Sequence, residues 1–297
     1  MRALWSEATT LGRRVRGRMI TEYQQWEFRW RAARVASRER LVLPHFVVIG
    51  ARKCGTTWLY ENLRAHPALY LAPGKGVEFF NNRLHNGVRF YASRFADAHG
   101  RLCGEVCGGY SFMPRERIRC MQRLLPQARL ILLMRNPIER AWSQALMQLV
   151  VQSGRPQEAI PDSEMLAFLR SDFVVRAGRY AAMLDNWLDV FPREQLHLGL
   201  FEDIANRPQT LLRRVLEHIG ASTNVDWVQF PLYDTILPPA GAQYADRDPG
   251  RGVTVREHES SEKRMPPRYR DFLREQYRPD IERLIARYAL PVRHWLG

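Results

Sequence analysis

The stretch HFVVIGARKCGTTWLYENL, residues 45–63, decides the fold of this chain. It begins with an apolar run over residues 45–49, reaches Gly50, and continues through a short loop into a helical pattern over residues 57–65. This order predicts a buried strand, a glycine-containing loop and a helix. At such a junction, backbone N–H groups and the positive end of the helix can bind an anion. We therefore expect a phosphate-binding loop at residues 50–57.

Further apolar runs alternate with helical patterns along the chain. The runs lie at residues 68–71, 102–106, 128–134 and 196–201, and the helical patterns lie near 114–125, 137–150, 176–191 and 205–219. Strands that are apolar on both faces and separated by helices are typical of a mostly parallel sheet. The sequence predicts an α/β fold: a P-loop-like, doubly wound parallel sheet flanked by helices. A long loop over 224–266 and a helix over 268–288 are expected to follow.

The first 41 residues differ from the rest of the chain. They contain ten arginines and four glutamates, with an apolar residue at every third or fourth position: Leu11, Val15, Met19, Tyr23, Trp26 and Trp30. This spacing predicts a basic amphipathic helical extension at residues 1–41, ahead of a main domain over residues 42–297. Two partners fit the apolar stripe, namely the main domain and, as the alternative, an anionic membrane surface.

Composition excludes several classes of protein. The 297 residues include 45 basic and 31 acidic side chains, a net charge of +14, and 45% hydrophobic residues, too many for a disordered polycation. The chain lacks an apolar window long enough for a membrane span, and its N-terminus lacks a signal-peptide pattern, so we expect a cytoplasmic protein, peripheral at a membrane if residues 1–41 bind lipid. The four cysteines show no metal-ligand spacing, so we expect reduced thiols and no metal.

The position of lysine separates the phosphate loop from a Walker A sequence. In a Walker A sequence a lysine follows the second glycine, whereas here Lys53 precedes Gly55 by two residues. Lysine occurs at only two other positions, Lys75 and Lys263, and every other basic residue is arginine. Because a compact ammonium differs from a planar guanidinium as an anion contact, we expect all three lysines to lie near bound anions.

A second anion site is predicted after the run that ends at Met134. Arg135 follows at the expected carboxyl end of a central strand, where doubly wound sheets bind ligands. Pro137 suits the first turn of the next helix, and Ser143 lies about two helical turns further on. The alternative for Arg135 is a surface ion pair with Glu139.

The segments KCGTTWL (53–59) and RNPIERAWS (135–143) resemble the two nucleotide-binding signatures of sulfotransferases that use 3′-phosphoadenosine 5′-phosphosulfate (PAPS). The likeness covers residues 44–297 and is nearest to the bacterial and heparan-sulfate-type carbohydrate branch. It implies that the 5′-phosphosulfate is bound by Arg52, Lys53, Cys54, Gly55, Thr56 and Thr57. It also implies that Arg135 and Ser143 bind the 3′-phosphate, and that Lys263 and Arg264 lie in a loop that closes over the nucleotide.

The resemblance also implies the reaction. A sulfuryl group would pass in line from PAPS to a hydroxyl or amine of an acceptor, by resemblance a carbohydrate or glycolipid, leaving 3′-phosphoadenosine 5′-phosphate (PAP). Lys53 would stabilise the leaving phosphate oxygen, and no metal is needed. Acceptor contacts are expected in loops 81–100, 150–177 and 224–258. The sequences of these loops do not identify the acceptor. The oligomeric state is not predicted.

The general base is the point at which this sequence departs from its relatives. The heparan-type branch resembles Lys-Glu-x-His-Phe-Phe, with the glutamate as base, but here Gly76 stands at that position and Glu78 follows two residues later. In an extended segment both positions face the same side, about 6 to 7 Å apart, so we expect Glu78 as the catalytic base. The rival base is Glu105, and the alternative for Glu78 is a solvated side chain or a partner of Lys75.

Two other functions compete. Residues 196–203, LHLGLFED, would suit a P-loop kinase with Asp203 on Mg²⁺, although the position of Lys53 argues against it. A basic module that binds an anionic surface would use the net charge, but the chain has no nucleic-acid fold signature, and nucleic acid is not an expected partner.

Overall fold

The structure is a computed structural model that describes residues 41–231 and 265–297. The predicted amphipathic stripe, Lys263, Arg264 and most of the predicted 224–266 loop lie outside the described residues. Among those that are described, no helix is both long and apolar enough to cross a membrane.

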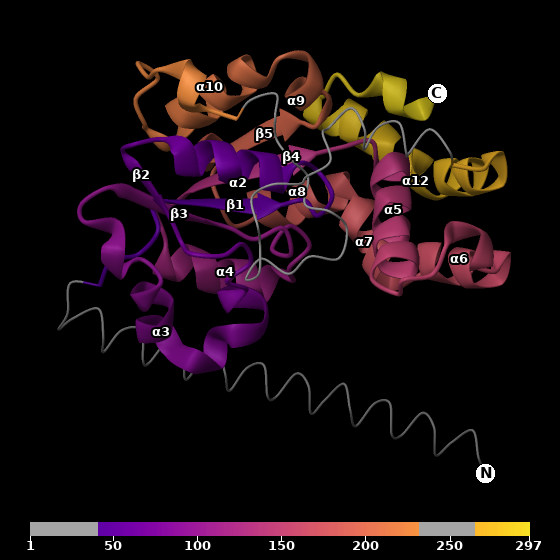
Figure 1. The fold of residues 1–297 in the computed structure, drawn as a ribbon, viewed down its shortest axis with the longest axis horizontal. Coiled ribbons are helices and arrows are strands. Elements are labelled where there is room, and N and C mark those ends of the chain that lie inside the picture. The colour runs from indigo at the N-terminus through magenta and orange to yellow at the C-terminus, as the bar shows by residue number, and fades with distance from the viewer. Residues whose placement is uncertain (1–40, 232–264) are drawn as a thin grey trace, which may run out of the picture.

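A five-stranded parallel sheet forms the centre of the molecule (Figure 1). The strands are β1 (Phe46–Gly50), β2 (Leu69–Leu71), β3 (Leu102–Val106), β4 (Arg129–Met134) and β5 (Leu196–Leu200). They lie in the order β2-β3-β1-β4-β5, and every neighbouring pair is parallel. The predicted doubly wound sheet is confirmed, and each predicted strand agrees with the observed one to within one residue at either end.

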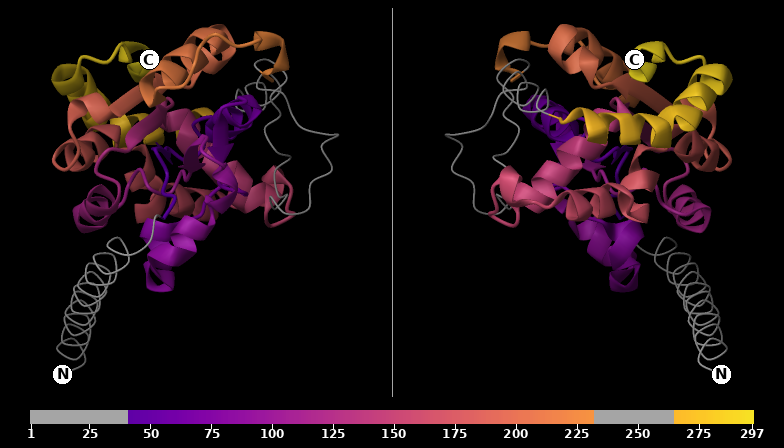
Figure 2. Two further views of the ribbon diagram at one scale, coloured as in Figure 1. Left: turned by 90° about the vertical axis from the view of Figure 1, so that its left-hand side faces the viewer. Right: turned by 90° about the vertical axis from the view of Figure 1, so that its right-hand side faces the viewer.

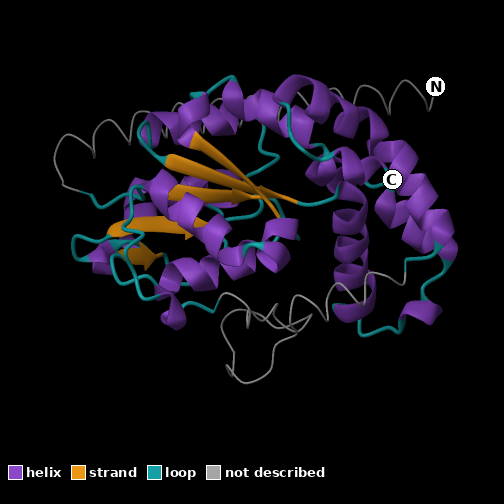
Figure 3. Ribbon diagram, turned by 90° about the horizontal axis from the view of Figure 1, so that it is seen from above, coloured by secondary structure: helices purple, strands orange, loops and turns teal. Residues whose placement is uncertain are grey.

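The central strands are apolar because both faces of the sheet are covered by helices (Figure 3). Every residue of β1 is buried, and in β4 only Arg129, at its start, is exposed. Phe46 pairs with Gly104 of β3, and a side chain at Gly104 would lie 2.3 Å from the Phe46 ring. The glycine therefore makes room for the aromatic ring between the two strands.

The helices of the described residues follow the strands in alternation. They are α2 (Thr56–Ala65), α3 (Gly87–Ser93), α4 (Arg115–Leu124), α5 (Pro137–Ala145), α6 (Asp162–Leu169), α7 (Asp172–Gly178), α8 (Tyr180–Leu188), α9 (Glu202–Asn206), α10 (Pro208–Ile219) and α12 (Pro267–Tyr288). A π-helical segment, Leu146–Val151, continues α5. The long α12 (Figure 2) packs against α8 and α5, and it includes Pro279.

Several helix predictions are wrong in detail. The helix expected over 176–191 is two helices, because Arg179 leaves the helical conformation with φ −87° and ψ 77°. The helix expected over 205–219 is also divided, at Arg207, because the following Pro208 disfavours a helical conformation in the residue before it. The expected loops 81–100 and 150–177 contain α3, α6 and most of α7, short helices whose weak periodicity hides them in the sequence.

Candidate functional site

The two predicted anion sites open at the same edge of the sheet. The loop after β1 and Arg135 after β4 follow neighbouring parallel strands, and the N–H of Ala51 donates to the carbonyl of Leu133 at 2.8 Å. The chain leaves β1 toward β2 on one side and leaves β4 toward β5 on the other. This edge is therefore the topological switch point of the sheet, where open α/β folds bind ligands.

The loop after β1 turns tightly into α2. Lys53 and Gly55 both have positive φ values, 66° and 81°. Gly55 is the N-cap residue of α2, and a side chain there would lie 2.1 Å from Ile204 of α9. Because glycine offers no capping oxygen, it leaves the first N–H groups of α2 to other acceptors, as an anion-binding helix start requires.

Two of the three lysines lie at this loop. The Nζ of Lys53 lies 3.5 Å from the Sδ of Met147, and Lys53 is half-buried. Burial, followed by the positive charge of Arg135, lowers the pKa of Lys53 to about 8. The Nζ of Lys75 donates to the hydroxyls of Thr56 at 3.1 Å and Thr57 at 2.6 Å. The third lysine, Lys263, is outside the described residues.

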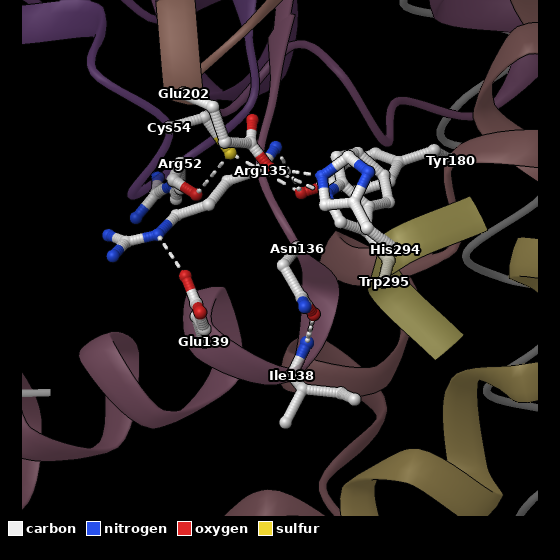
Figure 4. A network of polar contacts seen from close by, with 10 residues as sticks. All are labelled: Arg52, Cys54, Arg135, Asn136, Ile138, Glu139, Tyr180, Glu202, His294 and Trp295. Carbon is white, nitrogen blue, oxygen red and sulfur yellow. Dashed lines mark hydrogen bonds and ion pairs between the residues drawn. The ribbon is translucent and has the colours of Figure 1, made fainter. Parts of the chain in front are cut away.

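Arg135 lies at the second predicted site (Figure 4). Its side chain is 1% exposed, its Nε lies 3.5 Å from the Oε2 of Glu139, and its guanidinium lies 4.0 Å from the centre of the Phe201 ring. Burial lowers the pKa of Arg135, while Glu139 raises it. The ion pair with Glu139, which was the alternative prediction for Arg135, is therefore present. Arg135 is buried, however, and does not lie at the surface.

Tyr180 joins the two sites. Its Oη lies 3.3 Å from the thiol of Cys54 in the loop, and it accepts a hydrogen bond of 3.3 Å from the N–H of Arg135 (Figure 4). Burial raises the pKa of the Cys54 thiol, so this sulfur is neutral and acts in packing and hydrogen bonding. Tyr180 was not predicted as a site residue, because a tyrosine at the start of a helix carries no chemical signature of its own.

Ser143, the other predicted 3′-phosphate ligand, is buried on α5 at 2% exposure. Arg140, three residues before it, lies on the same face of α5, and Met147, four residues after it, lies in the π-helical segment that continues this helix. Met147 is the residue that contacts Lys53. The face of α5 that carries Ser143 is therefore the one that meets the phosphate loop.

Arg52 and Glu78 form an ion pair beside the loop. The Nη2 of Arg52 lies 3.1 Å from the Oε1 of Glu78, and Asn82 donates to the other Glu78 oxygen at 2.5 Å. Glu78 thus pairs with Arg52, whereas Lys75 bonds the loop threonines. The expected extended geometry at residues 76–78 is wrong, because Gly76 and Glu78 have positive φ values, 79° and 53°. The Glu78 side chain remains 28% exposed.

Glu105 has the opposite environment. It is 1% exposed on β3 and accepts hydrogen bonds from the hydroxyls of Tyr91 at 2.5 Å and Tyr110 at 3.5 Å. Burial raises the pKa of Glu105 to about 7, although both tyrosine hydrogen bonds lower it. Tyr91 stacks on Phe79, with ring centres 4.4 Å apart. Glu105 is therefore enclosed in an aromatic cluster, whereas Glu78 can be reached from solvent.

The described residues contain no group of three or more His, Cys, Asp or Glu side chains that could hold a metal ion. Asp203, the residue on which the kinase alternative depends, lies in the first turn of α9. Its carboxylate accepts a hydrogen bond from Arg207 at 2.7 Å.

Comparison with known proteins identifies the family. The model of the sulfotransferase domain family matches residues 43–230. The chain belongs to the sulfotransferase family. This result confirms the resemblance carried by KCGTTWL and RNPIERAWS.

Two relatives of this sulfotransferase bear on its site and fold. Mouse heparan sulfate glucosamine 3-O-sulfotransferase 3A1 is 32% identical over 187 residues, which are 60% of this chain and 46% of that protein. The chain thus spans about half the length of the curated relatives it matches. The crystal structure of a sulfotransferase from Alicyclobacillus acidocaldarius has 25% identity and a TM-score of 0.62, covering 86% of this chain and 100% of that one.

A third match shows the same fold at low identity. It is a mouse sulfotransferase in complex with PAP, with 13% identity and a TM-score of 0.51, covering 83% of this chain and 88% of that one. The parallel sheet flanked by helices is therefore the fold of sulfotransferases.

Proposed function

We propose that this chain transfers a sulfuryl group from PAPS to a hydroxyl, or an amine, of a carbohydrate or glycolipid acceptor and releases PAP. One observation carries the proposal: Lys53 and Arg135 follow the two strands of the switch point, close enough that the charge of Arg135 lowers the pKa of Lys53. Two cations held this close at neighbouring strand ends favour a ligand with more than one negative charge.

The residues present fit PAPS. The phosphate loop offers the first N–H groups of α2, the hydroxyls of Thr56 and Thr57 and the ammonium of Lys75, all suited to a phosphosulfate. Arg135 and Ser143 would hold the 3′-phosphate, and a planar guanidinium suits the oxygens of a phosphate. Lys263 and Arg264 are proposed to close over the nucleotide by resemblance alone.

The role proposed for Lys53 is electrostatic. Bound PAPS supplies the sulfuryl group, and negative charge develops on the phosphate oxygen from which that group departs. A pKa of about 8 keeps most Lys53 side chains protonated at pH 7, and a neighbouring phosphate further favours the charged form. A positioned ammonium in a half-buried site stabilises this charge more than water does.

The proposed general base is Glu78. Its exposure allows an acceptor to approach, and its ion pair with Arg52 holds one carboxylate oxygen in place. Glu105 has a pKa closer to neutral, but its oxygens already accept hydrogen bonds from two buried tyrosines. An acceptor hydroxyl would have to displace Tyr91 or Tyr110 to reach it.

The acceptor class rests on the relatives, whose names specify heparan sulfate, so a carbohydrate is the first acceptor to test. The experiment is transfer of labelled sulfate from PAPS to unsulfated and N-sulfated heparosan, glycolipids and small phenols. Labelled polysaccharide supports the proposal. Labelled phenol with unlabelled polysaccharide would contradict the acceptor class, and no labelled product on any acceptor would contradict the proposed activity.

The cellular location remains a proposal as well. A cytoplasmic protein, peripheral at a membrane through residues 1–41, agrees with the basic composition of that segment.

A further inference from the structure

Arg140, in the middle of α5, is a fully buried cation without an acidic partner among the described residues. It is 0% exposed. One of its nitrogens, Nη2, donates to the carbonyl of Val174 at 2.7 Å and lies 3.5 Å from the hydroxyl of Tyr277. Its Nε and Nη1 are also buried, and in the part of the chain that the structure describes they have no hydrogen-bond partner. A buried guanidinium in this state is costly to the fold.

The known contacts of Arg140 do not explain why a charge is needed there. The carbonyl of Val174 also accepts a hydrogen bond from the hydroxyl of Tyr277 at 2.9 Å. This carbonyl would therefore remain satisfied without Arg140, and the contact between α7 and α12 would keep its own hydrogen bond. A neutral side chain of similar length would fill the same volume at a lower desolvation cost.

Arg140 lies where its charge can act on the phosphate loop. It lies three residues before Ser143, on the face of α5 that continues to Met147 and so to Lys53. The charge of Arg140 contributes to the lowered pKa of Lys53, and it also opposes the effect of burial on the pKa of Cys54. Lys53, Arg135 and Arg140 thus form a group of three cations around the switch point.

We propose that Arg140 is a positioning residue whose missing counter-charge is provided by the phosphates of the bound nucleotide. It acts through Lys53 and Ser143, from behind the binding surface, since its own nitrogens are shielded from solvent. This inference rests on the proposed function for the identity of the anion. The ligand-free site carries an excess of positive charge that a polyanionic nucleotide neutralises, and the cost of burying Arg140 is recovered on binding.

Two substitutions separate a role of charge from a role of hydrogen bonding. Arg140→Gln removes the charge and keeps a donor for the Val174 carbonyl, whereas Arg140→Lys keeps the charge and loses the planar group. Tyr277→Phe is the matched control, because it removes a hydroxyl from the same carbonyl without changing any charge. Circular dichroism and thermal melting of each variant identify those that fold.

The first measurement is made on the ligand-free protein. Competitive labelling with acetic anhydride, followed by mass spectrometry, gives the pH dependence of Lys53 reactivity, with Lys75 in the same sample as reference. Loss of a nearby positive charge favours protonation, so Arg140→Gln should raise the apparent pKa of Lys53, while Arg140→Lys and Tyr277→Phe should not. An unchanged Lys53 titration in Arg140→Gln would overturn the proposal, whether or not the protein binds PAP.

The second measurement is PAP affinity by calorimetry. Arg140→Gln should weaken PAP binding about 10-fold or more, and Arg140→Lys should stay within about 3-fold of the unmodified protein. If Arg140→Gln binds PAP normally and Arg140→Lys binds it poorly, Arg140 acts through its hydrogen bonds and not through its charge, and the proposal is wrong. Failure of the unmodified protein to bind PAP would instead contradict the proposed function, and the Lys53 titration would still decide the role of Arg140.

Discussion

The proposed donor side and the proposed acceptor side of this site are built differently. The donor side consists of a loop and a helix that directly follow two neighbouring central strands, and its cations are buried or half-buried there. The acceptor side, with Glu78 and the ion pair to Arg52, lies in a segment of irregular backbone with positive φ values. Under the proposed function, the sheet fixes the nucleotide-binding residues, whereas the acceptor is chosen by segments that can change without altering the sheet.

The largest effect is expected on the acceptor side. Glu78→Gln should lower kcat by about 1000-fold, because a neutral amide cannot remove the acceptor proton, while PAP affinity stays within a few-fold. Sulfate transfer and PAP calorimetry measure the two properties. The matched variant is Glu105→Gln. If it abolishes turnover and Glu78→Gln remains active, the base belongs to the aromatic cluster, and the proposed acceptor side is wrong.

The next effect tests the donor side. Lys53→Ala should lower kcat by at least about 100-fold, because the leaving phosphate oxygen loses its positioned cation. Lys75→Ala is the comparison, and a smaller loss is expected because that ammonium is bonded to Thr56 and Thr57. Steady-state kinetics with saturating PAPS provide the measurement. A Lys53→Ala enzyme within a few-fold of normal activity would remove Lys53 from the chemistry.

A smaller effect distinguishes the two carboxylates through stability. The pKa of Glu105 is raised to about 7 in the folded protein, so the folded state binds more protons than the unfolded state between about pH 4.5 and 7. The contribution of Glu105 is therefore fully present below about pH 4.5 and is lost as the pH rises through 7. Relative to Glu105→Gln, the unmodified protein should lose about 2 kcal/mol of stability between pH 5 and 8.

Urea unfolding of both proteins at the two pH values gives this difference. If the stability of the two proteins depends on pH in the same way, Glu105 titrates normally. That result would contradict the burial of Glu105 between Tyr91 and Tyr110.

The smallest effect concerns the N-terminal extension. With the main domain as the partner of its apolar stripe, deletion of residues 1–41 should lower the melting temperature by a few degrees and leave liposome association unchanged. Thermal melting and sedimentation with phosphatidylserine vesicles test this. An unchanged melting temperature, together with salt-sensitive vesicle binding that only the full chain shows, would assign the stripe to a membrane.

The sequence predicted well where Lys53 and Arg135 lie in the fold, because both residues follow regular elements. The run that ends at Ile49 and the run that ends at Met134 mark their strands by composition, and Lys53 and Arg135 follow them at fixed spacing. Parallel strands then bring the two positions to one edge. The helix face that joins Ser143 to Met147 follows from helical spacing once the helix is placed.

The remaining parts depend on contacts that no local pattern records. Tyr180 joins Cys54 to Arg135 only because α8 begins beside both of them. The partner of Glu78 is Arg52, 26 residues away, and the conformation of Glu78 is set by a positive φ value that the sequence does not reveal for a glutamate. Burial of Glu105 between Tyr91 and Tyr110 likewise requires the packed structure.

The central claim is that the neighbouring ends of β1 and β4 bind the two ends of one nucleotide. Calorimetry with PAP, adenosine 5′-phosphosulfate and ATP·Mg²⁺ on the unmodified protein and on Arg135→Ala tests it most directly. PAP should bind without metal and more tightly than ATP·Mg²⁺. Arg135→Ala should weaken PAP by about 2 kcal/mol or more and leave adenosine 5′-phosphosulfate, which lacks the 3′-phosphate, little changed. Equal losses for both ligands, or tighter binding of ATP·Mg²⁺ than of PAP, would contradict the account.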